Sequence, residues 1–498
     1  MATYKEFHQY SIEQPDAFWT EQAQLVDWQA PFTQVCDFSR PPFAKWFVGG
    51  KTNLCHNAVD RHAAKRPDDA ALIFVSTETN EEKIYSFAEL QAEVERMAAI
   101  YQSLGVKRGD RVLIYMPMIP QAAFAMLAAT RIGAIHSVVF GGFASGSLAT
   151  RIDDAKPVLI VSSDAGMRGG KAVPYKHLLD EAINLAENKP AKVLMIDRGL
   201  DKAFNKVDGR DVDYAALRET HLNARVACEW LESSEPSYIL YTSGTTGKPK
   251  GVQRDTGGYA VALASSMQHI YCGGEGETFF STSDIGWVVG HSYIIYGPLI
   301  AGMATIMYEG TPLRPDPGIW WQIVEKYKVT VMFSAPTAAR VLKKQDPAYM
   351  HKYDLSTLKH IFMAGEPLDQ PTHEWFQSEL GRPVIDNYWQ TETGWPMLAA
   401  LHGVEKTPIK FGSPSFPVYG YNLKIYREDG SSARPMKRVS PPSCHRCRLA
   451  ACPPSGARMI ASSPPTSRCS RSRWFIPPTT GRSRMTKVTS PSSVGPTT

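Results

Sequence analysis

The sequence predicts an α/β fold with mostly parallel strands, and three observations support this. Short apolar runs alternate with longer segments of amphipathic spacing along most of the chain. Polar, glycine-rich motifs directly follow several of these runs, where open α/β sheets bind their ligands. The 498 residues are 43% hydrophobic and 21% charged, which is a globular composition. Such alternation produces a parallel sheet with helices on both faces.

Residues 1–60 precede this alternation and are rich in aromatic side chains. We expect an irregular, extended segment that large side chains pin onto the body. These side chains are Phe18, Trp19, Trp28, Phe32, Phe43, Trp46 and Phe47.

The alternation itself begins after residue 60 and continues to about residue 385. Amphipathic spacing predicts helices over 87–104, 121–132 and 175–188. Apolar runs predict strands over 70–75, 111–115, 134–139, 158–162, 193–196, 238–241, 305–308, 330–333, 360–363 and 383–385.

Charge divides the chain near Gly430. Residues 431–498 contain twelve Lys and Arg and no Asp or Glu, together with four of the eight cysteines and eleven of the 36 prolines. Residues 1–430 contain the other 42 of the 54 basic residues and all 49 acidic residues, so they carry a net charge of −7. The overall charge of +5 therefore describes an acidic body with a basic tail.

The cysteines and apolar runs of residues 1–430 indicate where in the cell the protein is expected. Cys36, Cys55, Cys228 and Cys272 show no zinc-binding spacing, and no signal segment precedes them, so we expect a cytoplasmic protein. The longest apolar stretch, near 122–135, is interrupted by Arg131, so no membrane association is expected.

The segment Tyr241-Thr-Ser-Gly-Thr-Thr-Gly-Lys-Pro-Lys-Gly251 follows a predicted strand and has the composition of a phosphate-binding loop. Glycines let backbone N–H groups converge on an anion, hydroxyl groups add donors, and Lys248 or Lys250 supplies positive charge. The glycine spacing differs from that of a Walker A loop. A flexible surface loop is the alternative interpretation.

This segment resembles the phosphate-binding signature of the adenylate-forming superfamily, and two later segments resemble its other motifs in the same order. Gly365-Glu366-Pro367 is similar to the loop on which adenine stacks, and Asp386-Asn387-Tyr388-Trp389-Gln390-Thr391-Glu392 is similar to the acyl-adenylate motif. The resemblance implies catalytic roles for Lys248, Thr391 at the α-phosphate, and Glu392 as the Mg²⁺ ligand. The implied ATP-binding residues are Thr242, Ser243, Gly244, Thr245, Thr246, Gly247, Lys248, Gly365, Glu366, Pro367, Asp386, Asn387, Tyr388, Trp389, Gln390 and Thr391.

Three further segments resemble the acetyl- and propionyl-CoA synthetase group. They are Phe140-Gly141-Gly142-Phe143, Arg168-Gly169-Gly170-Lys171 and the stretch from Asp284 to Ser292. The implied CoA-binding residues are Phe140, Gly141 and Gly142 near its adenine, and Arg168, Gly169, Gly170 and Lys171 near its phosphates. The implied fold over 61–430 is the family's large domain, with two α/β/α subdomains and a small β-barrel-like one. His291 is more typical of a packing residue than of a base.

The same resemblance predicts a small acyl pocket lined by Val288, Val289, Ala364 and Trp389. Trp389 would close its floor and exclude fatty acids. Acetate-selective relatives typically carry Thr at the position of Val289 and Val at that of Ala364, so this pocket has space for one more carbon. A buried methylene is worth about 0.8 kcal/mol. We therefore expect propionate to be preferred over acetate, although ordinary core packing of Trp389 and Ala364 is an alternative.

The implied reaction is ATP-dependent formation of an acyl-adenylate and transfer of the acyl group to CoA, with propionate, acetate, ATP, CoA and Mg²⁺ as the small molecules involved. Nucleic acid is not an expected partner. An acetyl-CoA synthetase and a non-catalytic nucleotide- or CoA-binding protein are the alternatives.

Residues 431–498 depart from the family, in which a mobile domain with a catalytic Lys follows. Their Ser, Pro and Arg content predicts an unstructured basic tail and impaired activity. In a shifted reading frame, Trp474-Phe475 must encode Val, and 493–498 permits Gly-Arg-Thr-Asp-Asp, which resembles the family's hinge. We expect a frameshift near codon 431. A basic nucleic-acid-binding arm, a metal site at Cys444-His445-Arg446-Cys447 and a tail without function are the alternatives.

Overall fold

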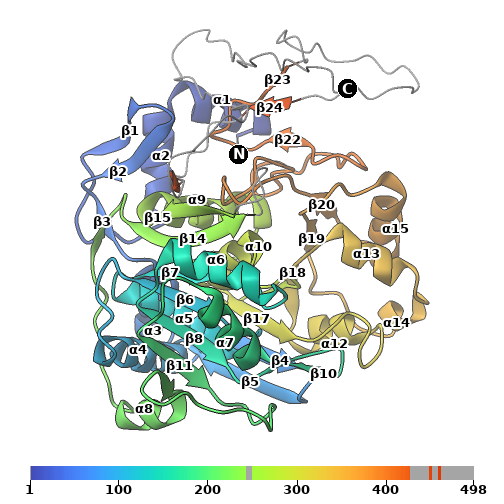
Figure 1. The fold of residues 1–498 in the computed structure, drawn as a ribbon. Helices are drawn as coiled ribbons and strands as arrows, with labels where there is room; N and C mark the ends of the chain where they lie inside the picture. Colours follow the sequence, from blue (N-terminus) through green and yellow to red (C-terminus); the bar gives the residue numbers. More distant parts are fainter. Residues whose placement is uncertain (1, 243–248, 427–447, 451–457, 461–498) are drawn as a thin grey trace, which may run out of the picture.

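The computed structural model describes residues 2–242, 249–426, 448–450 and 458–460. Two large β-sheets dominate them, as Figure 1 shows. Helices lie between the sheets and on their outer faces. The predicted phosphate loop over 243–248 and most of the basic tail lie outside the described residues.

The first large sheet has eight strands in the order β12-β11-β8-β6-β7-β14-β15-β25. The strands from β12 to β14 pair in parallel, and β15 and β25 add antiparallel pairs at one edge. Their bounds are β6 (Arg111–Tyr115), β7 (Ile135–Val138), β8 (Leu159–Ser163), β11 (Lys192–Ile196), β12 (Asp211–Asp213), β14 (Pro236–Thr242), β15 (Lys250–Asp255) and β25 (Arg458–Ile460).

The second large sheet has seven strands in the order β20-β19-β18-β16-β17-β4-β5. All pairs are parallel except the hairpin of β4 and β5. Their bounds are β4 (Ala70–Ser76), β5 (Glu81–Ser86), β16 (Thr278–Ser281), β17 (Ala304–Glu309), β18 (Val329–Ser334), β19 (His360–Met363) and β20 (Val384–Asp386).

Alternating side chains of the strands explain how both faces of each sheet are buried. Val112 and Ile114 of β6 belong to the central hydrophobic cluster, whereas Leu113 and Tyr115 belong to an outer one. In β4, the side chains of 72 and 74 likewise face the centre and those of 73 and 75 face outward. This is the period of two expected for a strand that is covered on both sides.

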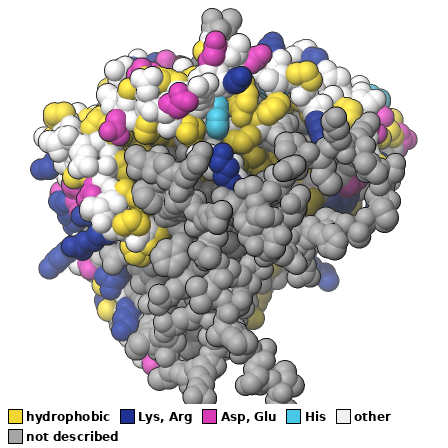
Figure 2. Space-filling model, turned by 90° about the horizontal axis from the view of Figure 1, so that it is seen from above, with side chains coloured by type: hydrophobic (Ala, Val, Ile, Leu, Met, Phe, Trp, Pro, Cys, Tyr) yellow, Lys and Arg dark blue, Asp and Glu magenta, His cyan; other side chains and the backbone are white. Residues whose placement is uncertain are grey.

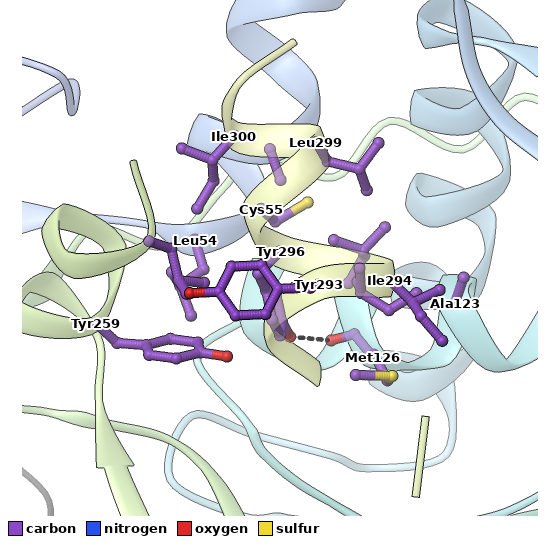
Figure 3. Close-up of a cluster of buried hydrophobic side chains, with 14 of the residues drawn as sticks. Leu54, Cys55, Ala123, Met126, Tyr259, Tyr293, Ile294, Tyr296, Leu299 and Ile300 are labelled. Carbon is purple, nitrogen blue, oxygen red and sulfur yellow. Dashed lines mark hydrogen bonds between the residues drawn. The ribbon is translucent and has the colours of Figure 1, made fainter. Parts of the chain in front are cut away.

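Helices between the sheets form the central layer. Helix α4 (Phe87–Ser103) packs on β4 and β5, and α5 (Pro120–Arg131) packs on α4, β6 and β7. Figure 3 shows part of this layer, where the Tyr296 hydroxyl donates to the Met126 carbonyl over 3.5 Å. The layer also contains α9 (Gly257–Ser266), η2 (Met267–Tyr271), α10 (Val288–Gly290), η3 (His291–Tyr296) and α11 (Gly297–Ile300), of which η2 and η3 are π-helical.

The outer helices cover the remaining faces. Helices α6 (Ser145–Ala155) and α7 (Tyr175–Leu185) pack on the eight-stranded sheet, and α12 (Ile319–Lys326) packs on the seven-stranded one. The other elements are η1 (His56–Asp60), α3 (Arg61–Lys65), α8 (Tyr214–Thr220), α13 (Pro336–Lys343), α14 (Ala348–His351) and α15 (Gln370–Leu380).

Small two-stranded sheets complete the described elements. They pair β1 (Gln34–Arg40) with β2 (Phe43–Val48), β3 (Lys51–Thr52) with β13 (Leu231–Glu232), β9 (Gly166–Arg168) with β10 (Lys171–Val173), β21 (Leu398–Ala399) with β22 (Phe416–Pro417), and β23 (Lys424–Tyr426) with β24 (Arg448–Ala450). Strands β24 and β25 come from the predicted unstructured tail.

The expectation of an irregular, extended N-terminal segment is wrong. Helices α1 (Tyr4–Glu13) and α2 (Pro15–Ala23) occupy most of its first half, and the β1–β2 hairpin follows. A capping box explains α1, because the Thr3 hydroxyl accepts from the Glu6 amide and the Glu6 carboxylate accepts from the Thr3 amide. The aromatic side chains do pin the segment, since Phe18 and Trp19 are buried against Tyr419.

Arg131 illustrates how the acidic body buries a cation. The residue ends α5, is 2% exposed, and donates to Asp60 over 2.8 Å and to Glu95 over 2.9 Å.

No described helix is long and apolar enough to cross a membrane. Figure 2 shows acidic and basic side chains interspersed on the described part of one face.

Candidate functional site

A cavity of about 430 Å³ lies at the carboxyl ends of β16, β18, β19 and β20, which are neighbours in the seven-stranded sheet. Thr282, Ser334 and Ala364 follow or end three of these strands and line the cavity. The Thr282 and Ser334 hydroxyl groups are hydrogen bonded to each other over 2.9 Å. The topology therefore creates a site where parallel strands end, as expected for an open α/β sheet.

All four residues predicted to form the acyl pocket line this one cavity. They are Val288, Val289, Ala364 and Trp389. Val288 and Val289 begin the short helix α10, Ala364 follows β19, and Trp389 follows β20. The Trp389 ring packs edge-on against Tyr293, with 5.4 Å between ring centroids, and lies 6.4 Å from Phe333. Core residues thus hold the indole in place at the cavity wall.

The predicted acyl-adenylate motif brings Thr391 and Gln390 to the same cavity. Tyr388 bridges to Leu398, and Asn387 donates from its side chain to the Tyr271 hydroxyl over 3.2 Å. Asp386 ends β20 with 7% exposure, and burial raises the pKa of its carboxyl group from 3.8 to about 7. The first half of the motif is therefore structural core, and its second half borders the cavity.

Glu392 follows Thr391 directly and is half-buried. Among the described residues, no hydrogen bond or ion pair engages its carboxylate, whereas its backbone carbonyl accepts from Arg254 over 3.2 Å. A carboxylate that no described residue binds, next to the cavity-lining Thr391, fits the oxygen ligand that Mg²⁺ prefers.

The described ends of the predicted phosphate loop form the base of a hairpin. Tyr241 pairs with Gly251, and Thr242 pairs with Lys250, across the antiparallel strands β14 and β15. Ser243, Gly244, Thr245, Thr246, Gly247 and Lys248 lie outside the described residues. The loop between them therefore starts at the carboxyl end of a central strand, as the sequence predicts.

The predicted adenine loop follows β19, and Gly365 at its start lines the cavity with φ of +104°. Glu366 accepts from Arg340 over 3.0 Å and from the Thr337 hydroxyl, and the Pro367 carbonyl accepts from Arg340 over 2.8 Å. Helix α13 therefore fixes this loop at the cavity edge.

The two predicted CoA-binding segments lie together. The Arg168 guanidinium lies 5.9 Å from the centroid of the Phe140 ring. Gly141 is required by close packing, since a Cβ atom there would lie 1.7 Å from the Tyr175 hydroxyl, and one at Gly142 would lie 2.4 Å from the Phe140 ring. The structure therefore unites residues that are about thirty positions apart in the chain.

Two left-handed glycines shape the Arg168–Lys171 turn so that their amides point toward one carboxylate. Gly169 and Gly170 have φ of +62° and +78°, and both amides donate to the Glu78 carboxylate over 2.7 Å. Arg314 in turn donates to the Gly169 carbonyl over 2.6 Å. Successive N–H groups in this geometry bind anions, and here a side chain of the same protein supplies the anion.

Sequence reasoning missed Trp287, which joins the two sites. Its side chain lines the cavity and is 46% exposed, and its ring lies 5.2 Å from Phe140. Trp287 lies within the stretch from Asp284 to Ser292, which resembles a motif of the acetyl- and propionyl-CoA synthetase group. His291 in the same motif is fully buried, stacks on His136 and has a pKa lowered to about 4 by burial, which agrees with its predicted packing role.

Family models account for nearly all of the described chain. The model described as "AMP-binding enzyme" matches residues 59–438, and the model "Acetyl-coenzyme A synthetase N-terminus" matches residues 4–58. The chain belongs to the AMP-binding enzyme family. The resemblance inferred from the motifs is thus confirmed, and the family's N-terminal model covers the segment that α1, α2 and the first hairpin form.

Individual relatives agree with this assignment. Propionate–CoA ligase of Escherichia coli (strain K12) is 62% identical over 426 residues, which cover 86% of this chain and 68% of the relative. Acetyl-coenzyme A synthetase of Methanothrix thermoacetophila is 43% identical over 438 residues, covering 86% of this chain and 65% of the relative. The chain therefore spans about two thirds of these relatives.

A solved structure confirms the fold class. Acetoacetyl-CoA synthetase from Streptomyces lividans superposes with a TM-score of 0.79 at 26% identity, covering 87% of this chain and 66% of that one. The two-sheet α/β architecture is therefore that of an acyl-CoA synthetase.

Proposed function

We propose that this protein activates propionate, and acetate more weakly, to the acyl-adenylate with ATP and transfers the acyl group to CoA. The observation that carries the proposal is the cavity in which Val288, Val289, Ala364 and Trp389 meet beside Thr391. The 62% identity to a propionate–CoA ligase supports the same substrate.

The cavity suits an acid with a very short apolar chain. Two valines, an alanine and an indole offer apolar contacts, and the Trp389 ring is backed by Tyr293 and Phe333. A methylene group added to acetate gains about 0.8 kcal/mol when it is buried there. Discrimination between acids that differ by one carbon in such a pocket is about 1–3 kcal/mol. Acetate is therefore expected to react, but less efficiently.

The first half-reaction joins a propionate carboxylate oxygen to the α-phosphorus of ATP and releases pyrophosphate. Thr391, which lines the cavity, would donate to the α-phosphate, and Lys248 with the other residues of the 242–248 loop would contact the phosphate chain. Gly365, Glu366 and Pro367 would contact the adenine. Such a reaction depends mainly on positioning and charge stabilisation.

Glu392 would hold Mg²⁺ through the carboxylate that has no partner among the described residues. When bound, the ion would neutralise charge that develops on the phosphate oxygens. Glu392 directly follows Thr391, which lines the cavity, so its carboxylate would lie near the phosphates of bound ATP.

The second half-reaction joins the CoA sulfur to the acyl carbon and releases AMP. Phe140, Arg168 and the glycines of the neighbouring turns would bind the nucleotide part of CoA, with Lys171 adding positive charge. Trp287 connects this region to the cavity, so it marks the path along which the thiol would reach the adenylate.

The test is propionate-dependent exchange of labelled pyrophosphate into ATP by the purified protein, with acetate and butyrate as comparison acids. We expect a higher kcat/KM for propionate than for either. A preference for acetate would favour the acetyl-CoA synthetase alternative. Calorimetric binding of ATP without exchange for any acid would favour the non-catalytic alternative.

We also propose that residues 431–498 are translated in a shifted reading frame. Their composition, with twelve basic and no acidic residues, supports this, and the AMP-binding model ends close by at residue 438. Sequencing the coding DNA tests it, because stop codons in the shifted frame near codon 431 would exclude the proposal. Assays should therefore compare the 498-residue chain with a chain translated in the other frame after residue 430.

A further inference from the structure

Beneath the cavity, a buried arginine on β15 contacts the turn that carries Thr391 and Glu392. The Arg254 side chain is 0% exposed. Its guanidinium donates to the carbonyl oxygens of Thr391 over 2.7 Å, Glu392 over 3.2 Å and Thr393 over 3.3 Å. Three successive carbonyl groups of one turn therefore converge on a single cation.

We propose that Arg254 is a positioning residue that fixes the Thr391–Gly394 turn, so that the Thr391 hydroxyl and the Glu392 carboxylate face the reacting phosphate. The proposal rests on the proposed function of this cavity and deepens it. The planar fork of five donors suits this task, because it binds several acceptors in a fixed mutual orientation. Burying a cation costs several kcal/mol unless acceptors surround it.

The turn is shaped around this guanidinium. Gly394 has φ of +78°, and a Cβ atom there would lie 2.7 Å from Arg254 Cζ. The Ser292 hydroxyl donates to the Gly394 carbonyl over 2.8 Å and is itself hydrogen bonded to Tyr259, whose ring lies 5.8 Å from the guanidinium. The contacts thus hold the turn from beneath.

Arg254 also connects the turn to the phosphate loop. It lies on β15, which begins at Lys250, and Lys250 pairs with Thr242 at the base of the loop. A rigid strand therefore joins the hairpin that carries the loop to the turn that carries Glu392. A shift of Arg254 would change the distance between the two sets of phosphate contacts.

The experiment compares R254K with R131K in the whole chain. Each substitution removes the fork but keeps the charge, and both arginines are fully buried, although Arg131 pairs with Asp60 and Glu95 instead of the turn. Hydrogen exchange would be measured at the Thr393 and Gly394 amides, which donate to the Gln390 carbonyl over 3.1 Å each. This readout needs no activity.

We expect at least tenfold faster exchange of these two amides in R254K and no change in R131K. In the pyrophosphate exchange assay, kcat of R254K should fall at least tenfold with the KM for propionate unchanged, whereas R131K should lose thermal stability alone. Unchanged amide exchange and unchanged kcat in a folded R254K protein would overturn the proposal.

Gly394→Ala provides a second test if R254K does not fold, because its Cβ atom meets the guanidinium while Arg254 remains. Faster exchange of the Thr393 amide and a lower kcat are expected, and a wild-type result for both would overturn the proposal. Should a chain translated in the other frame after residue 430 also fail to exchange pyrophosphate, the proposed function fails. The amide exchange still decides the role of Arg254.

Discussion

The cavity and the Arg168–Lys171 turn differ in how their polar groups are satisfied. The cavity lies where four parallel strands end, and its wall residues are fixed by core packing. The turn is largely exposed, and its two glycine amides are already bound to Glu78. In the proposed function, the first site would be preformed for its ligand, whereas the second would have to release the Glu78 carboxylate before it could bind a phosphate.

This difference separates the two proposed half-reactions. Adenylation would use groups that need no rearrangement, such as Thr391 and the Glu392 carboxylate, which has no partner in the described part of the chain. Thioester formation would include an exchange of one anion for another at the turn. Substitutions at the cavity should therefore change the chemistry or the folded state strongly, and substitutions at the turn should change CoA affinity modestly.

The largest expected effect concerns Asp386, whose carboxyl group is buried in the core at the end of β20. Burial raises its pKa from 3.8 to about 7, so the folded protein binds a proton that the unfolded chain releases between these pH values. Its contribution is most favourable below about pH 4 and is lost as the pH rises to about 7. A shift of this size corresponds to about 4 kcal/mol.

Asp386→Asn should remove this pH dependence. Denaturant unfolding at pH 4, 5, 6 and 7 measures it, and the stability of the variant relative to the wild type should increase steadily over that range. A constant difference across the four pH values would show that Asp386 titrates normally and that its carboxyl group is not desolvated.

Glu392→Gln should give the next largest effect. The amide keeps the shape of the side chain but loses the charge that would hold Mg²⁺, so we expect pyrophosphate exchange to fall about 100-fold, as when one transition-state stabilising group is removed. Half-maximal exchange should also need more Mg²⁺. An unchanged Mg²⁺ dependence would contradict the assignment of Glu392 as the metal ligand.

Ala364→Val tests the shape of the preformed site. Two added methyl carbons at the cavity wall should reduce kcat/KM for propionate about tenfold relative to acetate, within the range for one carbon atom in an apolar pocket. The ratio of kcat/KM for propionate to kcat/KM for acetate controls for folding, because misfolded protein would lower both values equally. Equal losses for both acids would place Ala364 outside the acyl subsite.

Much of this comparison could be predicted from the sequence, because local patterns specify the strands and the motifs that follow them. Every strand predicted from an apolar run exists. The bounds of β6 and β19 are as predicted, and those of the other strands, such as β14, are shifted by one or two residues. The four acyl-pocket residues were predicted from motif resemblance, and they line one cavity.

The remaining features depend on contacts between distant segments. Helix α9 shows no amphipathic period because all ten of its residues are buried. The hydrogen bonds from the Gly169 and Gly170 amides to Glu78 join positions about ninety residues apart. The hydrogen bond from Arg254 to the Thr391 carbonyl joins positions 137 residues apart. Helix α1 does not depend on a distant contact. Thr3 and Glu6 form a local capping box, a signal in the sequence that the prediction of an extended segment overlooked.

The smallest expected effect is at the exposed turn. Glu78→Gln replaces a charged acceptor with a neutral one, so the carboxylate no longer competes with a phosphate for the Gly169 and Gly170 amides. Charge-assisted hydrogen bonds are about twice as strong as neutral ones, so we expect the KM for CoA to fall about fivefold. Glu81→Gln is the matched control, because Glu81 is exposed on the neighbouring strand β5. Propionate-dependent pyrophosphate exchange should be unchanged in both variants, since the cavity is untouched. If Glu78→Gln instead raises the KM for CoA, Glu78 supports the shape of the turn rather than occupying its anion site, and both sites are then preformed.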